Sequence, residues 1–119
     1  MTKITFTGDI IIAPEQLQAI TKNADGNFST IFEPIASLLK ESDFVVGNLE
    51  TPLGGKNLGY TNHKWSFNTP DELADSLKKS GVDIISNMSN HSLDKGEYGF
   101  IRTREVLKEK GCRLGIVTS

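Results

Sequence analysis

Short runs of β-branched and aromatic residues alternate along the chain with longer segments whose apolar residues recur every three or four positions. The short runs favour strands, and they occupy residues 3–7, 44–46, 83–88 and 113–117. Gly8 is expected to end the first of these strands. Residues 44–46 are apolar throughout, which is typical of a strand buried on both faces of a parallel sheet.

The segments between these runs have helical spacing. A short helix is expected around 16–21, followed by a turn at Asp25-Gly26. An apolar stripe then predicts a second helix, although Pro34 leaves its first residue open because proline is comfortable only in a first turn. The stripe comprises Phe28, Ile31, Phe32, Ile35, Leu38 and Leu39.

The clearest local signal is the sequence Thr69-Pro70-Asp71-Glu72. It combines an N-cap threonine, a proline at the first helical position and a capping-box glutamate. The helix that follows is expected to end at Gly81 in a left-handed cap. Its predicted inward residues are Leu73, Ala74 and Leu77.

A last helix is expected over 97–110, with Gly111 after it. Its predicted inward residues are Phe100, Ile101 and Leu107. Strands that alternate with helices at this spacing indicate right-handed βαβ units. The predicted fold class is therefore α/β, with a mostly parallel sheet and flanking helices.

Composition narrows the classes of function. A chain of 119 residues with 37% hydrophobic residues fits one small domain with a single core. The net charge of −2 and the absence of a Lys/Arg stripe exclude a nucleic-acid binder. Lys78-Lys79 and the basic residues of 108–110 fit last-turn helix charges instead. Cys112, the single cysteine, excludes an internal disulfide and is expected to be a small buried hydrophobe.

No membrane segment is expected in this chain. Its longest aliphatic stretch near the N-terminus, residues 10–13, is far below the roughly 20 residues of a membrane span. No basic segment followed by an apolar stretch is visible either, so no signal peptide is expected and the chain is expected to be soluble.

Three polar segments follow strand-like runs: 7–9, 47–50 and 89–91. Because the carboxyl ends of parallel strands lie along one edge of a sheet, we expect their side chains to converge there. The side chains are those of Asp9, Asn48, Glu50, Asn90 and His91. Such mixed oxygen and nitrogen donors suit divalent ions, with phosphate as a third party. A two-metal site also needs a bridging carboxylate and a nearby proton donor, which this set contains.

Each of these residues also has a structural interpretation. Asp9 alone fits an Asx turn, and Glu50 fits a surface glutamate before the Thr51-Pro52 turn. A single histidine such as His91 is commonly structural or solvated. The combination at three strand ends, rather than any one residue, favours a site.

Several of these segments together resemble a known family. They are Gly8-Asp9, Asn48-Leu49-Glu50-Thr51-Pro52, Phe67-Asn68-Thr69-Pro70, Gly81-Val82-Asp83 and Ser89-Asn90-His91-Ser92-Leu93-Asp94-Lys95-Gly96. They look like the CapA-type capsule synthesis proteins, which are linked to poly-γ-glutamate production and have the calcineurin-like metallophosphoesterase fold. Residues 1–119 resemble the N-terminal part of that domain, or half of a four-layer α/β/β/α sandwich.

The resemblance implies a role for each site residue. Asp9, Glu50 and Asn90 would contact one or two divalent ions (manganese, iron, zinc or magnesium), with Asn48 positioning the loop. His91 would face the phosphate or its leaving group, and Asp94 would orient His91 or shape the turn. Ser89 stands where family members usually have asparagine. The resemblance also suggests a cell-surface or membrane-associated location.

Lys64 and Trp65 either line the entrance to this site or belong to an aromatic loop that only packs, and His63 is expected to be exposed. The expected partners are the missing C-terminal half, which would carry further ligands, and a second copy bound through an uncovered apolar sheet face.

Three functions remain open. The first is a metal-dependent phosphoesterase that activates water for attack on a phosphate ester. The second is a non-catalytic component of polyglutamate export or anchoring that binds a metal or the anionic polymer. The third, a nucleotide-binding domain, is disfavoured because no glycine-rich phosphate loop follows the first strand.

Overall fold

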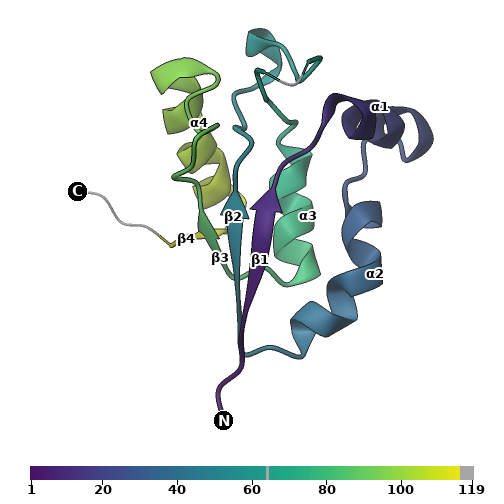
Figure 1. Ribbon diagram of the computed structural model, residues 1–119, viewed down its shortest axis with the longest axis vertical. Helices are drawn as coiled ribbons and strands as arrows, with labels where there is room; N and C mark the ends of the chain where they lie inside the picture. The colour runs from purple at the N-terminus through teal and green to yellow at the C-terminus, as the bar shows by residue number, and fades with distance from the viewer. Residues whose placement is uncertain (64, 116–119) are drawn as a thin grey trace.

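The computed structural model describes residues 1–63 and 65–115 (Figure 1). The strands of this part are β1 (Ile4–Ile10), β2 (Phe44–Leu49), β3 (Ile84–Ser86) and β4 (Arg113–Leu114). The α-helices are α1 (Pro14–Asn23), α2 (Ser29–Lys40), α3 (Glu72–Ser80) and α4 (Gly96–Glu109), and Lys56–Leu58 forms a short 3-10 helix. All strand pairs are parallel, in the order β1-β2-β3-β4. The predicted α/β class is confirmed and is consistent with half of a metallophosphoesterase-like sandwich.

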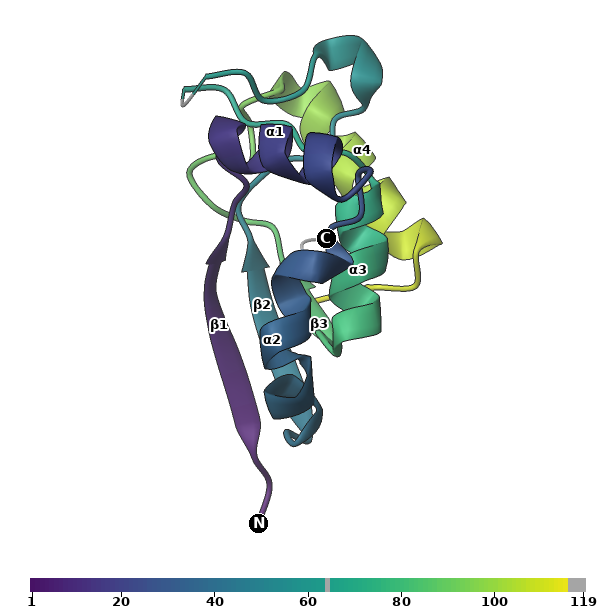
Figure 2. The same cartoon turned by 90° about the vertical axis from the view of Figure 1, so that its right-hand side faces the viewer.

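The strand order places the helices on one face of the sheet. Each strand pairs with the next along the chain, so every crossover steps in the same direction, and right-handed crossovers then keep to one side. Figure 2 shows α2 and α3 on the same side of β1 and β2. The core lies between these layers, and its central side chains are fully buried: Val45, Ile85, Leu73, Leu77 and Leu107.

The opposite face of the sheet is open. Ile4 of β1 is in register with Phe44 of β2, and Phe6 is in register with Val46. Phe6 is 72% exposed and Phe44 is 44% exposed. The prediction that residues 44–46 are buried on both faces is therefore wrong, because the described helices cover only the face that carries Val45.

The first strand is longer than its sequence pattern predicts. It continues through Gly8 to Ile10 because the pairing with β2 shifts register between Phe6 and Asp9. An irregularity of this kind accommodates an extra residue without ending the ladder. The third strand is shorter than predicted, and the predicted end of the fourth strand, 116–117, lies outside the described residues.

The second helix buries only part of its apolar stripe. Phe28, just before the helix, and Leu39 are buried, whereas Ile31, Ile35 and Leu38 are exposed and Pro34 lies within the helix. A cavity of about 270 Å³ separates α2 from β1, and Ile31, Phe32 and Ile35 line it. The expected continuous contact is absent because α2 does not close onto the sheet here.

The predicted cap of the third helix is wrong. α3 begins at Glu72, with Asp71 as its N-cap residue and no side-chain cap. The Thr69 hydroxyl instead pairs with the hydroxyl of Thr51 at 2.7 Å, and both residues are buried. A tertiary hydrogen bond has therefore replaced the local one, although the left-handed cap at Gly81 is confirmed.

The fourth helix faces the core with a different set of residues from the one predicted. Leu107 is buried as expected, but Ile101 is exposed and Thr103 points inward. The Thr103 hydroxyl accepts a hydrogen bond from the Leu53 amide at 2.9 Å and donates one to the Gly99 carbonyl at 2.7 Å. These bonds offset the cost of burying a hydroxyl, so a polar residue occupies the inward position.

Two further predictions concern the burial of Cys112 and the presence of a membrane-spanning helix. Cys112 is buried, as predicted, and burial raises the pKa of its thiol. Among the helices of the described residues, none is both long and apolar enough to cross a bilayer.

Candidate functional site

The carboxyl ends of β1 and β2 bring the first two predicted residues into contact. Asp9 is in register with Asn48, and Asn48 is in register with Ser86 of β3. The Asn48 Nδ2 donates a hydrogen bond to Asp9 Oδ1 at 2.7 Å. Paired residues of parallel strands point to the same face, so these polar groups continue the open face of the sheet at its carboxyl edge.

Glu50 joins them just beyond the end of β2. Its amide donates to the Ile10 carbonyl at 3.0 Å, which keeps the segment beside the end of β1. The pKa of Glu50 is raised above its ordinary value. The largest cause is burial, followed by the negative charge of Asp9 and a hydrogen bond between the two carboxyl groups. The charge of His91 acts in the opposite direction. Two carboxyl groups that share a site in this way favour a bound proton or a cation.

The shifted pKa of Glu50 predicts how stability depends on pH. Because the folded pKa is raised, the contribution of Glu50 to the free energy of unfolding is most favourable below about pH 4.3, where free glutamate is protonated. This contribution is lost as the pH rises through the folded pKa. Replacing Glu50 with glutamine, which resembles the protonated form, is expected to raise the melting temperature at pH 7 but not at pH 3.5. Circular dichroism melting curves in a chelator test this, with exposed Glu109→Gln as the control. A Glu50→Gln variant that is less stable at pH 7 would contradict it.

His91 lies on the turn between β3 and α4 and is held from two sides. Its Nδ1 lies 2.8 Å from Asp94 Oδ2, and the same carboxylate oxygen accepts the Phe67 amide at 2.9 Å. The Phe67 ring meets the imidazole edge to face, with 4.8 Å between the ring centroids. Asp94 therefore orients His91, one of the two roles that the sequence left open, and its amide also donates to the His91 carbonyl at 3.0 Å within the turn. Its contact with Phe67 ties the turn to the loop at residues 60–69, called the 60s loop below.

The turn itself has its own hydrogen bonds. The Ser92 hydroxyl donates to the Asn87 carbonyl and accepts the Ser89 amide at 2.8 Å. The Ser89 hydroxyl also lies 3.3 Å from the Ser92 hydroxyl, so Ser89 shapes the turn with both its backbone and its side chain. Asn90, its neighbour, is exposed.

The structure thus brings Asp9, Asn48 and Glu50 together, and places His91 close enough to Glu50 to affect its pKa. Asn90 lies on the same turn as His91 but on its exposed side. Trp65 is 75% exposed and His63 is exposed, as predicted for the histidine, while Lys64 lies outside the described residues. Phe67 was not expected at the site, although it belongs to the Phe67-Asn68-Thr69-Pro70 segment that resembles the family.

The donor chemistry fits a hard divalent cation only in part. The carboxylates of Asp9 and Glu50 and the amide oxygen of Asn48 are donors that such ions accept. Among the residues that the structure describes, however, no three His, Cys, Asp or Glu side chains are arranged to hold an ion. These residues can supply part of a coordination shell, and the remaining ligands would be water or other protein groups.

Comparison with known proteins defines the class of this chain. The family model described as "Bacterial capsule synthesis protein PGA_cap" matches residues 3–117, so the chain belongs to this family. The capsule biosynthesis protein CapA of Bacillus anthracis is 25% identical over 109 residues, which are 89% of this chain and 26% of that protein. The PGA biosynthesis protein CapA of Bacillus subtilis (strain 168) is 26% identical over 96 residues, 80% of this chain and 24% of that protein.

A third relative is described as uncharacterized. The uncharacterized protein y4uA of Sinorhizobium fredii is 30% identical over 110 residues, which are 87% of this chain and 22% of that protein. The chain spans about a quarter of the length of these curated relatives. The resemblance to CapA-type proteins, with this chain matching their N-terminal part, is therefore confirmed.

Proposed function

We propose that this chain is part of a metal-dependent phosphoesterase module within a capsule biosynthesis protein. The observation that carries the proposal is the meeting of two carboxyl groups, Asp9 and Glu50, at the carboxyl edge of the sheet, with His91 nearby. Like charges repel, so their approach is favourable when a cation or a proton lies between them. Family membership supports the setting in capsule biosynthesis.

In this proposal, Asp9 and Glu50 bind the cation, and Asn48 fixes the orientation of Asp9 through its 2.7 Å hydrogen bond. Asn90 is proposed as a further ligand from the adjacent turn. A divalent ion held by these residues would supply water activation and charge neutralisation at the phosphate oxygens.

His91 has the role of proton donor to the leaving-group oxygen. Asp94 occupies its Nδ1, which leaves Nε2 to face a substrate. The edge-to-face contact with Phe67 restricts rotation of the ring. A histidine whose second nitrogen is fixed by a carboxylate keeps one tautomer and one orientation, as general acid catalysis requires.

The test is hydrolysis of 4-nitrophenyl phosphate with added Mn²⁺. It compares this chain with the protein that the full open reading frame encodes. Asp9→Ala and His91→Ala are each expected to lower kcat/KM by about 100-fold or more in the active form. His63→Ala, which removes an exposed histidine of the 60s loop, is the matched control and should retain activity.

Calorimetric titration with Mn²⁺ separates the two classes of function. Binding that is lost in Asp9→Ala, without hydrolysis in any form, supports the non-catalytic component of polymer export instead. Absence of both metal binding and hydrolysis in the full-length protein would overturn both.

A further inference from the structure

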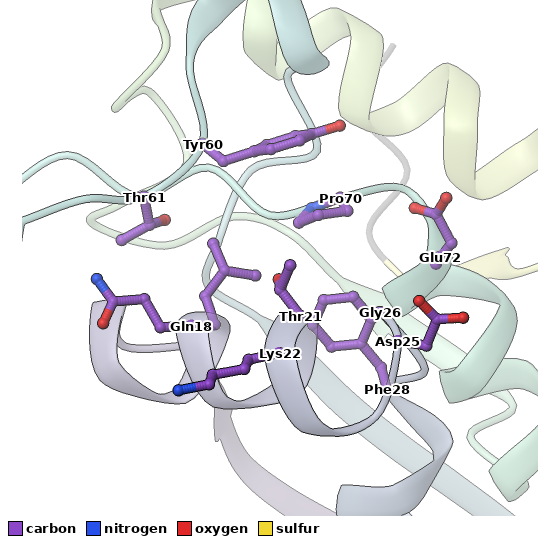
Figure 3. A pocket seen from close by; sticks show the side chains of 11 residues that line it. Gln18, Thr21, Lys22, Asp25, Gly26, Phe28, Tyr60, Thr61, Pro70 and Glu72 are labelled. Atoms are coloured by element: carbon purple, nitrogen blue, oxygen red, sulfur yellow. The ribbon is translucent and has the colours of Figure 1, made fainter.

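A second cavity lies away from the strand ends, between α1, the loop at residues 60–61 and the start of α3 (Figure 3). Its volume is about 770 Å³, within the range of roughly 300–1,000 Å³ that is typical of small-ligand pockets. It is lined by none of the residues of the candidate site, which are Asp9, Asn48, Glu50, Asn90 and His91. The cavity is therefore separate from the site of the proposed function, and the inference below does not depend on that function.

The interior of this cavity is mostly apolar. Tyr60 and Phe28 face it from opposite sides in Figure 3, with Pro70 between them, and Leu17 of α1 contributes a further apolar wall. Such walls favour an apolar ligand body because its burial removes hydrocarbon surface from water.

The wall that carries Tyr60 is fixed in place. The next residue, Thr61, donates its amide to the Asn68 carbonyl at 2.8 Å and its hydroxyl to the same carbonyl at 2.9 Å. Asn68 is itself fully buried. The cavity therefore has a formed wall before any ligand binds, which lowers the entropy cost of binding.

One end of the cavity is acidic. Asp25 and Glu72 both line it, and in Figure 3 their carboxylates project at the same end. Both also line an adjoining smaller hollow, which confirms that they are neighbours. Asp25 is held in a left-handed conformation (φ 53°) by the turn that precedes α2. Over the described part of the chain, neither carboxylate forms an ion pair.

Lys79 lines the adjoining smaller hollow together with Asp25 and Glu72, but among the described residues it forms no ion pair with either carboxylate. Arg102 binds Asp71 through two hydrogen bonds of 2.8 and 2.9 Å, so its charge is already paired. Lys22 lines the cavity, but Figure 3 shows its ammonium group turned away from Asp25 and Glu72. Consistent with a negative local potential, burial and then the charges of Asp71 and Glu72 raise the pKa of the Tyr60 hydroxyl.

We propose that this cavity binds a primary amine on a slender apolar chain, of the kind that a lysine side chain presents. The hydrocarbon would lie against the apolar walls that Tyr60, Pro70 and Leu17 form. The ammonium group would lie between the carboxylates of Asp25 and Glu72. A carboxylate ligand of the same length would be repelled at that end. Charge complementarity at a preformed apolar cavity is the basis of this preference.

The test is an NMR titration of ¹⁵N-labelled protein at pH 7 and low ionic strength with three probes of equal chain length: n-hexylamine, 1-hexanol and hexanoate. Saturable shifts at the amides of Leu17, Phe28 and Tyr60 are expected, with hexylamine binding about tenfold more tightly than hexanol and hexanoate more weakly than either. Added salt is expected to reduce the advantage of the amine.

The double variant Asp25→Asn/Glu72→Gln is expected to bind hexylamine and hexanol equally. Glu33→Gln, an exposed change on α2, serves as the matched control and should keep the tenfold preference. Circular dichroism of both variants establishes that they are folded. Equal binding of hexanol or hexanoate by the unmodified protein, a preference that survives in the double variant, or absence of saturable binding would overturn the proposal.

Discussion

Replacing Asn68 with alanine is expected to lower the free energy of unfolding by about 3 kcal/mol. The Asn68 side chain is fully buried and makes three hydrogen bonds to the loop between β2 and α3. Its Oδ1 accepts the Gly54 amide at 2.6 Å, and its Nδ2 donates to the carbonyls of Gly55 and Gly59 at 3.0 Å each. Alanine leaves these backbone groups buried without partners, and each such loss costs about 1 kcal/mol or more.

Equilibrium unfolding in urea measures this effect. Asn57→Ala, which changes an exposed asparagine of the same loop, is the matched control and is expected to shift the free energy by no more than about 0.5 kcal/mol. Asn68→Asp is a second probe, because it keeps an acceptor for Gly54 but loses both donors and buries a charge. We expect it to be at least as destabilising as alanine. Equal stability of Asn68→Ala and Asn57→Ala would show that the loop does not depend on this side chain.

Self-association through the open sheet face is the second large effect that we propose. Phe6 exposes most of its surface and Phe44 nearly half. The patch that they form continues through Ile4 and Val46. Burying a phenylalanine side chain stabilises a complex by roughly 1.5–3 kcal/mol, so a face with two of them favours association. Light scattering of the chain at concentrations above about 100 μM is therefore expected to give a mass above the 13.0 kDa of one copy.

The variant Phe6→Lys is expected to return the mass to that of a monomer, because a charge at the centre of the patch opposes its burial. Leu38→Lys, at an exposed apolar position of α2 in the helix layer, is the matched control and should leave association unchanged. A monomer for the unmodified chain at high concentration would contradict the prediction. Association that persists in Phe6→Lys would assign it to another surface.

The predictions that held for the helices depended on local chemistry. Gly81 ends α3 in the left-handed region at φ 102°, where glycine is least strained, and the spacing of Leu73 and Leu77 placed both in the core. The prediction for Thr69 failed because its hydroxyl found Thr51, 18 residues earlier in the chain. A local cap and a distant partner compete for the same hydroxyl, and the sequence does not show which one is within reach.

The candidate site also combines contacts that the sequence predicted with contacts that it did not. The rule that parallel strands end along one edge was enough to place Asp9 beside Asn48, and the structure gives them a direct hydrogen bond. The contacts of Phe67 with His91 and Asp94 could not be predicted, because they depend on how the 60s loop folds back over the turn after β3. Whether Asp9, Glu50 and Asn90 bind metal stays a prediction that the titrations above would test.

The sequence by itself determined the alternation of strands and helices, the parallel sheet and the edge at which polar side chains gather, since each follows from periodicity, turn residues and the handedness of crossovers. Only the tertiary structure decided which residues of α2 and α4 are buried, which sheet face is open and how closely Asp9 approaches Glu50. These features depend on contacts between distant segments, where burial, hydrogen bonding and charge repulsion are balanced together. A pattern along one segment does not contain that balance.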